Sequence, residues 1–175
     1  VTTQFGRLYR TGDVARELES PAYAMLEMED RLTEAGIPTT WSGPAELTEQ
    51  VSRWIAAGHT RVKIKVGQRG LDEDLERVAA VRRVIGPGRL LMVDANQLWD
   101  LPTARRAARA LSVFDIYWLE EPLPAEDFQA YAALRSAIDV PVAAGESLYT
   151  EAQFRDALLA GAVDYLQPNV CRVGG

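Results

Sequence analysis

Two hydrophobic periods alternate along the chain from residue 44 onward. Stretches with apolar residues at helical spacing are followed by shorter stretches with the pattern of a strand. Glycine-containing segments such as 86–88 separate them, and Thr150 and Gln153 form a capping-box signature before the last helix. The pattern predicts helices at 44–57, 71–85, 101–112, 125–136 and 150–160, and strands at 39–42, 60–67, 89–94, 115–120, 140–144 and 163–167.

Strands and helices that alternate with short connections predict parallel strands joined by right-handed crossovers. A closed (β/α)8 barrel takes ~200 to 250 residues, which is more than this chain offers. We therefore expect an α/β fold, a partial (β/α)8 TIM-type barrel of about six βα units, over residues 39–175. Residues 1–38 do not follow the alternation. An acidic helix over 23–36, followed by Pro38, predicts a separate helical segment there.

Charge and cysteine content limit the class of partner. A formal charge of −6 gives no electrostatic attraction to nucleic acid or to an anionic membrane surface, so a small molecule is the expected partner. The single cysteine excludes an internal disulfide, and no apolar run approaches the roughly 18 residues of a membrane span. A cytoplasmic location is therefore expected. Because an open arc of strands leaves two edges unpaired, we also expect a homo-oligomer.

Three carboxylates follow three successive predicted strands at a constant interval. Asp94, Glu120 and Glu146 are each 26 residues apart, and neighbouring strands lie roughly 4.8 Å apart. The three side chains should therefore converge at the carboxyl-terminal edge of the sheet, where barrel active sites form. Any one acid alone is more simply a helix cap. Three in register would repel one another, which favours a divalent cation, Mg²⁺, with Mn²⁺ as a substitute.

Two lysines lie in the strand predicted at 60–67. The alternation puts Lys63 and Lys65 on one face, an arrangement that is ordinary on an exposed edge strand. Between two helices an interior position is expected instead. Adjacent ammonium groups would then lower each other's pKa and make a base near neutral pH. A lysine base beside a carboxylate-held cation suits abstraction of the proton α to a carboxylate.

The same segments resemble the enolase superfamily, in its mandelate racemase and muconate lactonizing enzyme group. The resemblance covers residues 44–175, and the acidic helix before them is similar to the last helix of the family's N-terminal capping domain. The motifs that carry it are KIK at 63–65, VDAN at 93–96, WLEEP at 118–122, AGES at 144–147 and VDYLQPNVCRVGG at 163–175.

The resemblance implies a role for each site residue. Lys65 would be the acid/base on one face of the substrate, Lys63 would tune it and touch the substrate carboxylate, and Asn96 would contact substrate. Glu121, beside one of the ligands, is expected to point to the opposite side of the strand. The implied Mg²⁺ ligands are Asp94, Glu120 and Glu146.

One position departs from the family pattern. Racemase and dehydratase members commonly have an Asp, paired with a His on the next strand, where this chain has Asn169. An amide cannot hold an imidazolium as a carboxylate does, so Asn169 is assigned to substrate binding and a one-base reaction through Lys65 is favoured. The expected function is dehydration of a sugar acid, a small-molecule carboxylate. The alternatives are a racemase, epimerase or cycloisomerase of the same superfamily.

Two other hypotheses come from different classes of protein. A truncated, non-catalytic relative would bind metal or carboxylate, or pack against a partner, without turnover. A barrel aldolase would use Lys65 as a Schiff-base nucleophile, but it would leave the three aligned carboxylates unexplained. Trp99 and Trp118 are expected to pack against other side chains rather than to stack on a substrate, and Cys171 is expected to be a buried small side chain rather than a nucleophile. His59 is expected at the surface, on the amino-terminal face of the barrel.

Overall fold

The structure is a computed structural model that describes residues 43–68 and 70–173. The predicted strand at 39–42, the predicted helix at 23–36 and the segment 1–38 lie outside the described residues. The described helices are α3 (Pro44–Ala56), α4 (Leu71–Ile85), α5 (Leu101–Leu111), the 3-10 helix η1 (Ser112–Phe114), α6 (Phe128–Arg135) and α7 (Glu151–Leu159). The described strands are β1 (Arg61–Lys65), β2 (Leu90–Asp94), β3 (Ile116–Glu120), β4 (Val142–Ala144) and β5 (Tyr165–Leu166).

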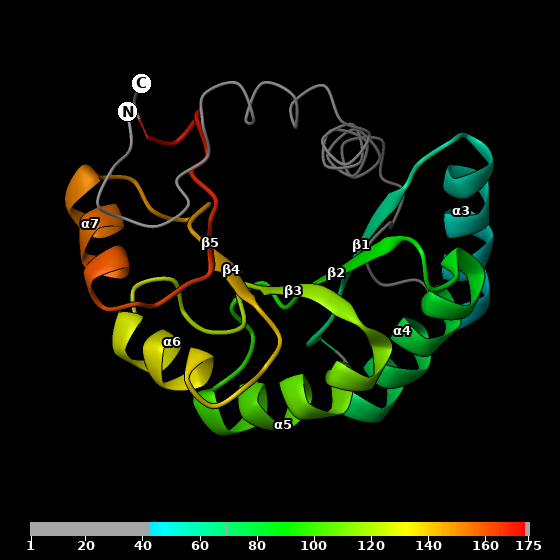
Figure 1. The fold of residues 1–175 in the computed structure, drawn as a ribbon, viewed down its shortest axis with the longest axis horizontal. Helices are drawn as coiled ribbons and strands as arrows, with labels where there is room; N and C mark the ends of the chain where they lie inside the picture. The colour runs from blue at the N-terminus through cyan, green and yellow to red at the C-terminus, as the bar shows by residue number, and fades with distance from the viewer. Residues whose placement is uncertain (1–42, 69, 174–175) are drawn as a thin grey trace.

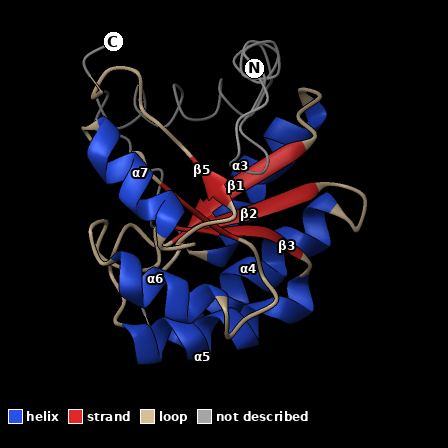
Figure 2. Ribbon diagram, turned by 60° about the vertical axis from the view of Figure 1, so that its left-hand side comes forward, coloured by secondary structure: helices blue, strands red, loops and turns tan. Residues whose placement is uncertain are grey.

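The strands form one parallel sheet in the order β1-β2-β3-β4-β5. Figure 1 shows a curved sheet with helices α3 to α7 along its outer side, and Figure 2 shows the same separation of the strands from the helices. This arrangement confirms the predicted α/β class and the partial barrel. Among the described residues, none of the helices combines the length and apolar content that a membrane crossing requires.

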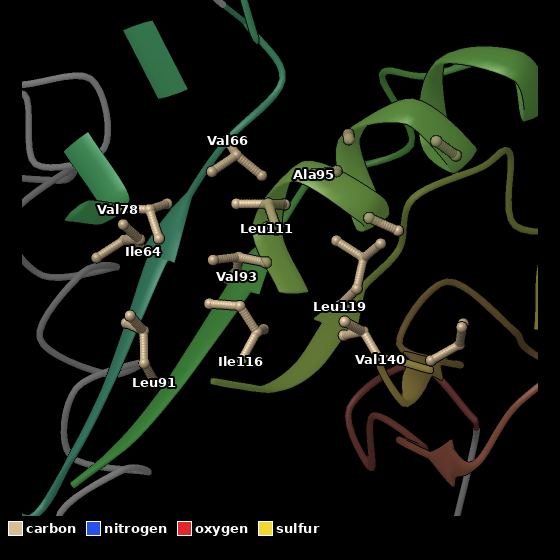
Figure 3. Close-up of a cluster of buried hydrophobic side chains, with 14 of the residues drawn as sticks. Ile64, Val66, Val78, Leu91, Val93, Ala95, Leu111, Ile116, Leu119 and Val140 are labelled. Carbon is tan, nitrogen blue, oxygen red and sulfur yellow. The ribbon is translucent and has the colours of Figure 1, made fainter. Parts of the chain in front are cut away.

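Apolar side chains of the strands and helices fill the space between the two layers. Side chains from β1, β2 and β3 meet side chains from α4 and α5 in one buried cluster (Figure 3). Each fully buried aliphatic side chain contributes about 1.5–3 kcal/mol to the stability of the fold. Residues of this cluster include Val62, Ile64, Val66, Val78, Leu91, Val93, Ala95, Leu111, Leu119 and Val142. The core therefore occupies the outer face of the sheet, and the inner face carries the polar residues of the site.

Side-chain caps begin three of the helices. Asp100 accepts a hydrogen bond from the Thr103 amide, 2.8 Å away, at the start of α5. Asp127 does the same for α6, with a distance of 3.0 Å to the Ala130 amide. The predicted capping box of α7 is confirmed, since Thr150 and Gln153 each bond to the other's backbone.

Three predicted elements begin at least two residues later than the sequence pattern suggested: β4 and β5 begin two residues later, and α6 begins three residues later. Strand β4 starts at Val142 because the preceding Pro141 has no N–H to donate to a neighbouring strand. Helix α6 starts at Phe128 because the Asp127 amide bonds to the Pro124 carbonyl in a turn before it. All three shifts leave the order of elements unchanged.

A bulge in β3 sets the alignment of the strand tips. Leu91 pairs with Ile116, but the next pair is Met92 with Trp118, so Tyr117 is an extra residue in β3. As a result Asp94 is the direct partner of Glu120. Without the extra residue, Asp94 would face Leu119 and the Glu120 side chain would turn to the other face of the sheet.

Candidate active site

The two lysines of β1 pair with the carboxylates at the tips of β2 and β3. Lys65 Nζ lies 2.6 Å from Asp94 Oδ2, and Lys63 Nζ lies 3.5 Å from the same oxygen. Lys63 also donates to Glu120 Oε1 over 2.6 Å. Because both lysines reach one oxygen, the prediction that they share a face is confirmed. The ammonium of Lys63 lies between two strand-tip carboxylates and balances both.

The pairing reverses the expected direction of the Lys63 pKa. Burial acts to lower this pKa, but the charges of Glu120 and Asp94 outweigh it and hold the Lys63 pKa above its ordinary value. The prediction that neighbouring ammonium groups would lower it was therefore wrong for Lys63. The carboxylates touch the ammonium directly, and direct attraction outweighs repulsion between the lysines.

Glu120 is held at both of its carboxylate oxygens. Its Oε2 accepts a hydrogen bond from Trp118 Nε1 over 2.8 Å, while Oε1 is occupied by Lys63. The packing that was predicted for Trp118 is found, and this hydrogen bond is a further contact that the sequence did not indicate. The ring of Trp118 also lies 5.4 Å, centre to centre, from that of Tyr165 on β5. The buried Trp99 does pack in the core as expected.

Glu146 lies past the end of its strand. The residue of β4 that pairs with Glu120 is Ala143, and Glu146 follows it by three positions, after Gly145. Burial raises the pKa of Glu146, and the charges of Glu121 and Glu120 raise it further. The carboxylates of the three loops therefore lie within electrostatic reach of one another, although only two of the tips are in direct register.

Glu121 turns toward the site instead of away from it. Its φ of 38° ends the extended conformation of β3, so the rule of alternating faces does not hold at this residue. The side chain is 1% exposed, and its Oε1 atom has no hydrogen-bond partner among the described residues. Burial raises the pKa of Glu121, with a further contribution from the charge of Asp94.

The charge and chemistry of this cluster fit a divalent cation. Two ammonium groups against four carboxylates, those of Asp94, Glu120, Glu121 and Glu146, leave a formal charge of −2. All of the acidic donors are hard oxygen ligands, and one buried oxygen is unpartnered. Within residues 43–68 and 70–173, no three acidic, histidine or cysteine side chains already surround one metal position. The Lys63 ammonium lies between Asp94 and Glu120 instead.

The two predicted substrate-binding asparagines differ in their placement. Asn96 lies beside the cluster, where its backbone N–H donates to Asp94 Oδ1 over 2.9 Å and its φ is 45°. Asn169 follows β5, and its side-chain oxygen accepts from the Cys171 amide in a local turn. No bond between Asn169 and the carboxylate cluster is found in the described part of the chain. Cys171 is exposed, which corrects the prediction of a buried thiol. His59 is half-buried just before β1.

The motifs did not single out a buried ion pair that holds the end of β1. Asp74 and Arg77 of α4 are 1% and 0% exposed, and their side chains are 3.2 Å apart. Arg77 Nη1 donates to the Lys65 carbonyl over 2.8 Å, and Asp74 Oδ2 accepts from the Gly67 amide over 2.7 Å. This pair therefore fixes the backbone of Lys65 from the outer layer. A charged pair within an amphipathic helix gives no sequence signal that separates it from a solvated one.

Gln97 is a second residue that the motifs missed. It directly follows VDAN, and its side-chain amide reaches the loops after both β3 and β4. Only its position next to a strand tip could have indicated a role in the site. That signal is weak, because polar residues are common at such positions.

Comparison with known proteins identifies the family. Residues 46–175 match the enolase C-terminal domain-like family. The chain is 45% identical over 114 residues to L-talarate/galactarate dehydratase of Salmonella typhimurium, covering 65% of this chain and 29% of the relative. It is 40% identical over 131 residues to 3,6-anhydro-alpha-L-galactonate cycloisomerase of Streptomyces coelicolor, covering 75% of this chain and 36% of the relative. The chain thus spans about a third of the length of these curated relatives.

A solved structure agrees with the same assignment. The structure of L-talarate dehydratase from Polaromonas sp. JS666, complexed with Mg and L-glucarate, has a TM-score of 0.74 and 43% sequence identity. The alignment covers 77% of this chain and 38% of that one. The chain therefore belongs to the enolase C-terminal domain-like family, in the mandelate racemase and muconate lactonizing enzyme group of the enolase superfamily.

Proposed function

We propose that this chain is the barrel portion of a Mg²⁺-dependent enzyme that removes the proton α to a carboxylate and dehydrates a sugar acid. The observation that carries the proposal is the convergence of the Lys63 and Lys65 ammonium groups on Asp94 and Glu120 at adjacent strand tips. The proposed proton acceptor is therefore in direct contact with the carboxylates that would bind the cation. Glu146 would complete the metal ligands.

The use of lysine at these two positions supports acid/base chemistry. Lys63 and Lys65 are the only lysines in the sequence, and all other Lys or Arg positions are arginine. Arginine would pair with a buried carboxylate at least as well, but it does not lose its proton in proteins. A site that needs only charge balance would accept arginine, whereas a site that moves a proton needs lysine.

The two lysines would divide the work between them. Bound Mg²⁺ supplies stabilisation of the negative charge that develops on the substrate carboxylate. The Lys65 amine would take the α proton, and the electron pair of that C–H bond would move toward the carboxylate. That pair would then form a double bond to the β carbon as the C–O bond of the β hydroxyl breaks. The Lys65 ammonium would return its proton so that the hydroxyl leaves as water, and the enol product would tautomerise to a 2-keto acid. Lys63 would face the substrate carboxylate and pair with it as an ammonium.

The names of the relatives support a sugar acid as the substrate class. Dehydratases acting on talarate, galactarate and galactonate are among them, and one related structure was solved with L-glucarate. Cycloisomerisation is the second candidate, because cycloisomerases of 36–43% identity are also among the relatives and related structures. The position of Asn169, turned into its own local turn, favours a one-base reaction over a two-base racemisation.

The test is the loss of the α-proton NMR signal of L-glucarate or galactarate in D₂O with Mg²⁺, followed together with formation of a keto acid. We expect Lys65→Met to abolish exchange while leaving the Mg²⁺ affinity, measured by calorimetry, within about twofold of the starting value. Asp94→Asn should weaken Mg²⁺ binding by about tenfold or more. A parallel titration with Mn²⁺ tests the proposed substitute.

Arg83→Met is the matched control, because Arg83 is an exposed basic residue of α4 away from the site. It should retain both exchange and Mg²⁺ binding. Equal loss of Mg²⁺ binding in Lys65→Met and Asp94→Asn would contradict the proposed division of roles. Exchange without keto-acid formation would favour the cycloisomerase alternative.

A further inference from the structure

The loop that carries Glu146 is weakly held by the sheet. Only two residue pairs join β3 to β4, and the second of them is Glu120 with Ala143. Glu146 lies three residues beyond that pair, and within the described residues it forms no ion pair shorter than 4 Å, unlike Asp94 and Glu120. Because the carboxylates of the three loops repel one another, their spacing needs a restraint other than the strand ladder.

The side chain of Gln97 supplies such a restraint. Its Nε2 donates to Glu121 Oε2 over 3.2 Å and to Ser147 Oγ over 3.0 Å. Its Oε1 accepts from the Ala125 amide over 2.9 Å. One half-buried amide thus joins the loop after β2, where it resides, to the loops after β3 and β4. Ser147 is next to Glu146 in the chain, and Glu121 is next to Glu120.

The backbone at Gln97 and at the residues it contacts adopts an uncommon conformation. Asn96, Gln97 and Glu121 have φ values of 45°, 63° and 38°, the left-handed region that non-glycine residues rarely adopt. The backbone N–H of Gln97 also donates to the Glu121 carbonyl over 2.6 Å. Such conformations persist only when surrounding contacts compensate for their cost. The backbone and side-chain hydrogen bonds of Gln97 supply this compensation. They hold Glu121 and Ser147, which are next to Glu120 and Glu146 in the chain.

A glutamine is well suited to this position. The amide offers two donors to the carboxylate and the hydroxyl and an acceptor to the backbone N–H at the same time. A glutamate of the same length could not donate to either group and would add a further negative charge to the cluster. The chemistry of the contacts therefore calls for an amide and not merely for a polar side chain.

We propose that Gln97 is a positioning residue that holds the loops after β2, β3 and β4 at the spacing that a cation shared by Asp94, Glu120 and Glu146 requires. It acts on Glu146 through Ser147 and on Glu120 through Glu121. The effect of Gln97 on cation binding rests on the proposed function. Its effect on the spacing of the loops applies to the metal-free chain and does not depend on that function.

The experiment compares Gln97→Ala and Gln97→Glu with Gln50→Ala in the full chain. Gln50 is the matched control, because it is also a half-buried glutamine but lies in α3, outside the three loops. The two readouts are Mg²⁺ affinity by calorimetry and hydrogen–deuterium exchange of the metal-free protein over 121–127 and 145–148. Both Gln97 variants should weaken Mg²⁺ binding by about 10- to 100-fold and speed exchange in both loops. Gln50→Ala should leave Mg²⁺ binding within about twofold and the exchange of both loops unchanged.

The outcomes separate the proposal from the proposed function. Unchanged exchange in both loops of the Gln97 variants would overturn the proposal, whatever the metal data show. If the unsubstituted chain does not bind Mg²⁺ but the Gln97 variants exchange faster, the proposed function fails and the positioning role stands. If a Gln97 variant does not fold, Ser147→Ala replaces it, because it breaks the same link to Glu146 and should speed exchange over 145–148 alone.

Discussion

Lys63 Nζ lies 2.6 Å from Glu120 Oε1 and 3.5 Å from Asp94 Oδ2, so one side chain balances two buried carboxylates. Its raised pKa means that the lysine side of this pairing stabilises the fold fully below the ordinary lysine pKa, as long as both carboxylates are ionised, and that this contribution is lost when the pH rises through the raised value. A bound cation would compete with this ammonium for the same oxygens. The residue therefore serves the metal-free fold as well as the proposed site.

We predict that Lys63→Met lowers the free energy of unfolding of the metal-free protein by about 3–5 kcal/mol, because it leaves the buried Glu120 carboxylate without its cation and leaves Asp94 paired with Lys65 alone. Saturating Mg²⁺ should recover part of the loss. Urea denaturation with and without Mg²⁺ measures both values. Arg155→Met is the control, since Arg155 pairs with Asp156 at the surface, and its effect should stay within about 0.5 kcal/mol. A loss that Mg²⁺ does not reduce would contradict this prediction.

Gly145 is the residue that lets the chain turn from β4 toward Glu146. Its φ is 135°, and a Cβ atom there would lie 3.0 Å from the Gln167 backbone nitrogen. We expect Gly145→Ala to destabilise the fold by about 1–3 kcal/mol, as measured by urea denaturation. Gly88→Ala should change stability by no more than about 0.5 kcal/mol, because Gly88 has open space around it and no positive φ. Equal effects of the two substitutions would show that the close approach to β5 is unimportant.

Helix α4 does more than cover the sheet. Its Asp74–Arg77 pair is buried, and it bonds to the backbone at Lys65 and Gly67, where β1 ends. Charges in the outer layer thus set the position of a lysine on the inner face. Helix packing and site geometry are coupled through this pair.

We predict that Arg77→Met lowers the free energy of unfolding by about 3–5 kcal/mol, because Asp74 would keep a buried charge without its partner. Thermal or urea denaturation checks this value. Arg53→Met on α3 provides the comparison, since the Arg53–Glu49 pair is largely exposed and should contribute no more than about 0.5 kcal/mol. Similar losses in the two variants would mean that burial does not decide the strength of these pairs.

At the scale of the molecule, the strands within 43–68 and 70–173 form an open parallel sheet. Within the described residues, β1 pairs only with β2, and β5 pairs only with β4. Strand edges of this kind recruit other strands unless something covers them. We predict that this chain self-associates, with a light-scattering mass above that of the monomer that falls on dilution. A folded monomer over the whole concentration range would contradict the expected homo-oligomer.

Much of the fold followed from hydrophobic period alone. Residues 61–65 and 90–94 alternate or run apolar because one face of each strand packs on helices, and this burial is visible in sequence. Lys63, Lys65 and the strand-tip carboxylates could be named as candidates for the same reason, since each lies at a fixed place in its βα unit. The short β4 and β5 were harder to bound, because two or three paired residues leave little periodicity.

The sequence by itself determined the order of strands and helices, the family, and the residues that could take part in a site. Only the tertiary structure decided how those residues face one another. The bulge at Tyr117 aligns Asp94 with Glu120, and the left-handed turn at Glu121 brings a further carboxylate inward. Strand register, backbone handedness and the pKa of Lys63 depend on neighbours far away in the chain, and a local pattern of residue types carries no information about them.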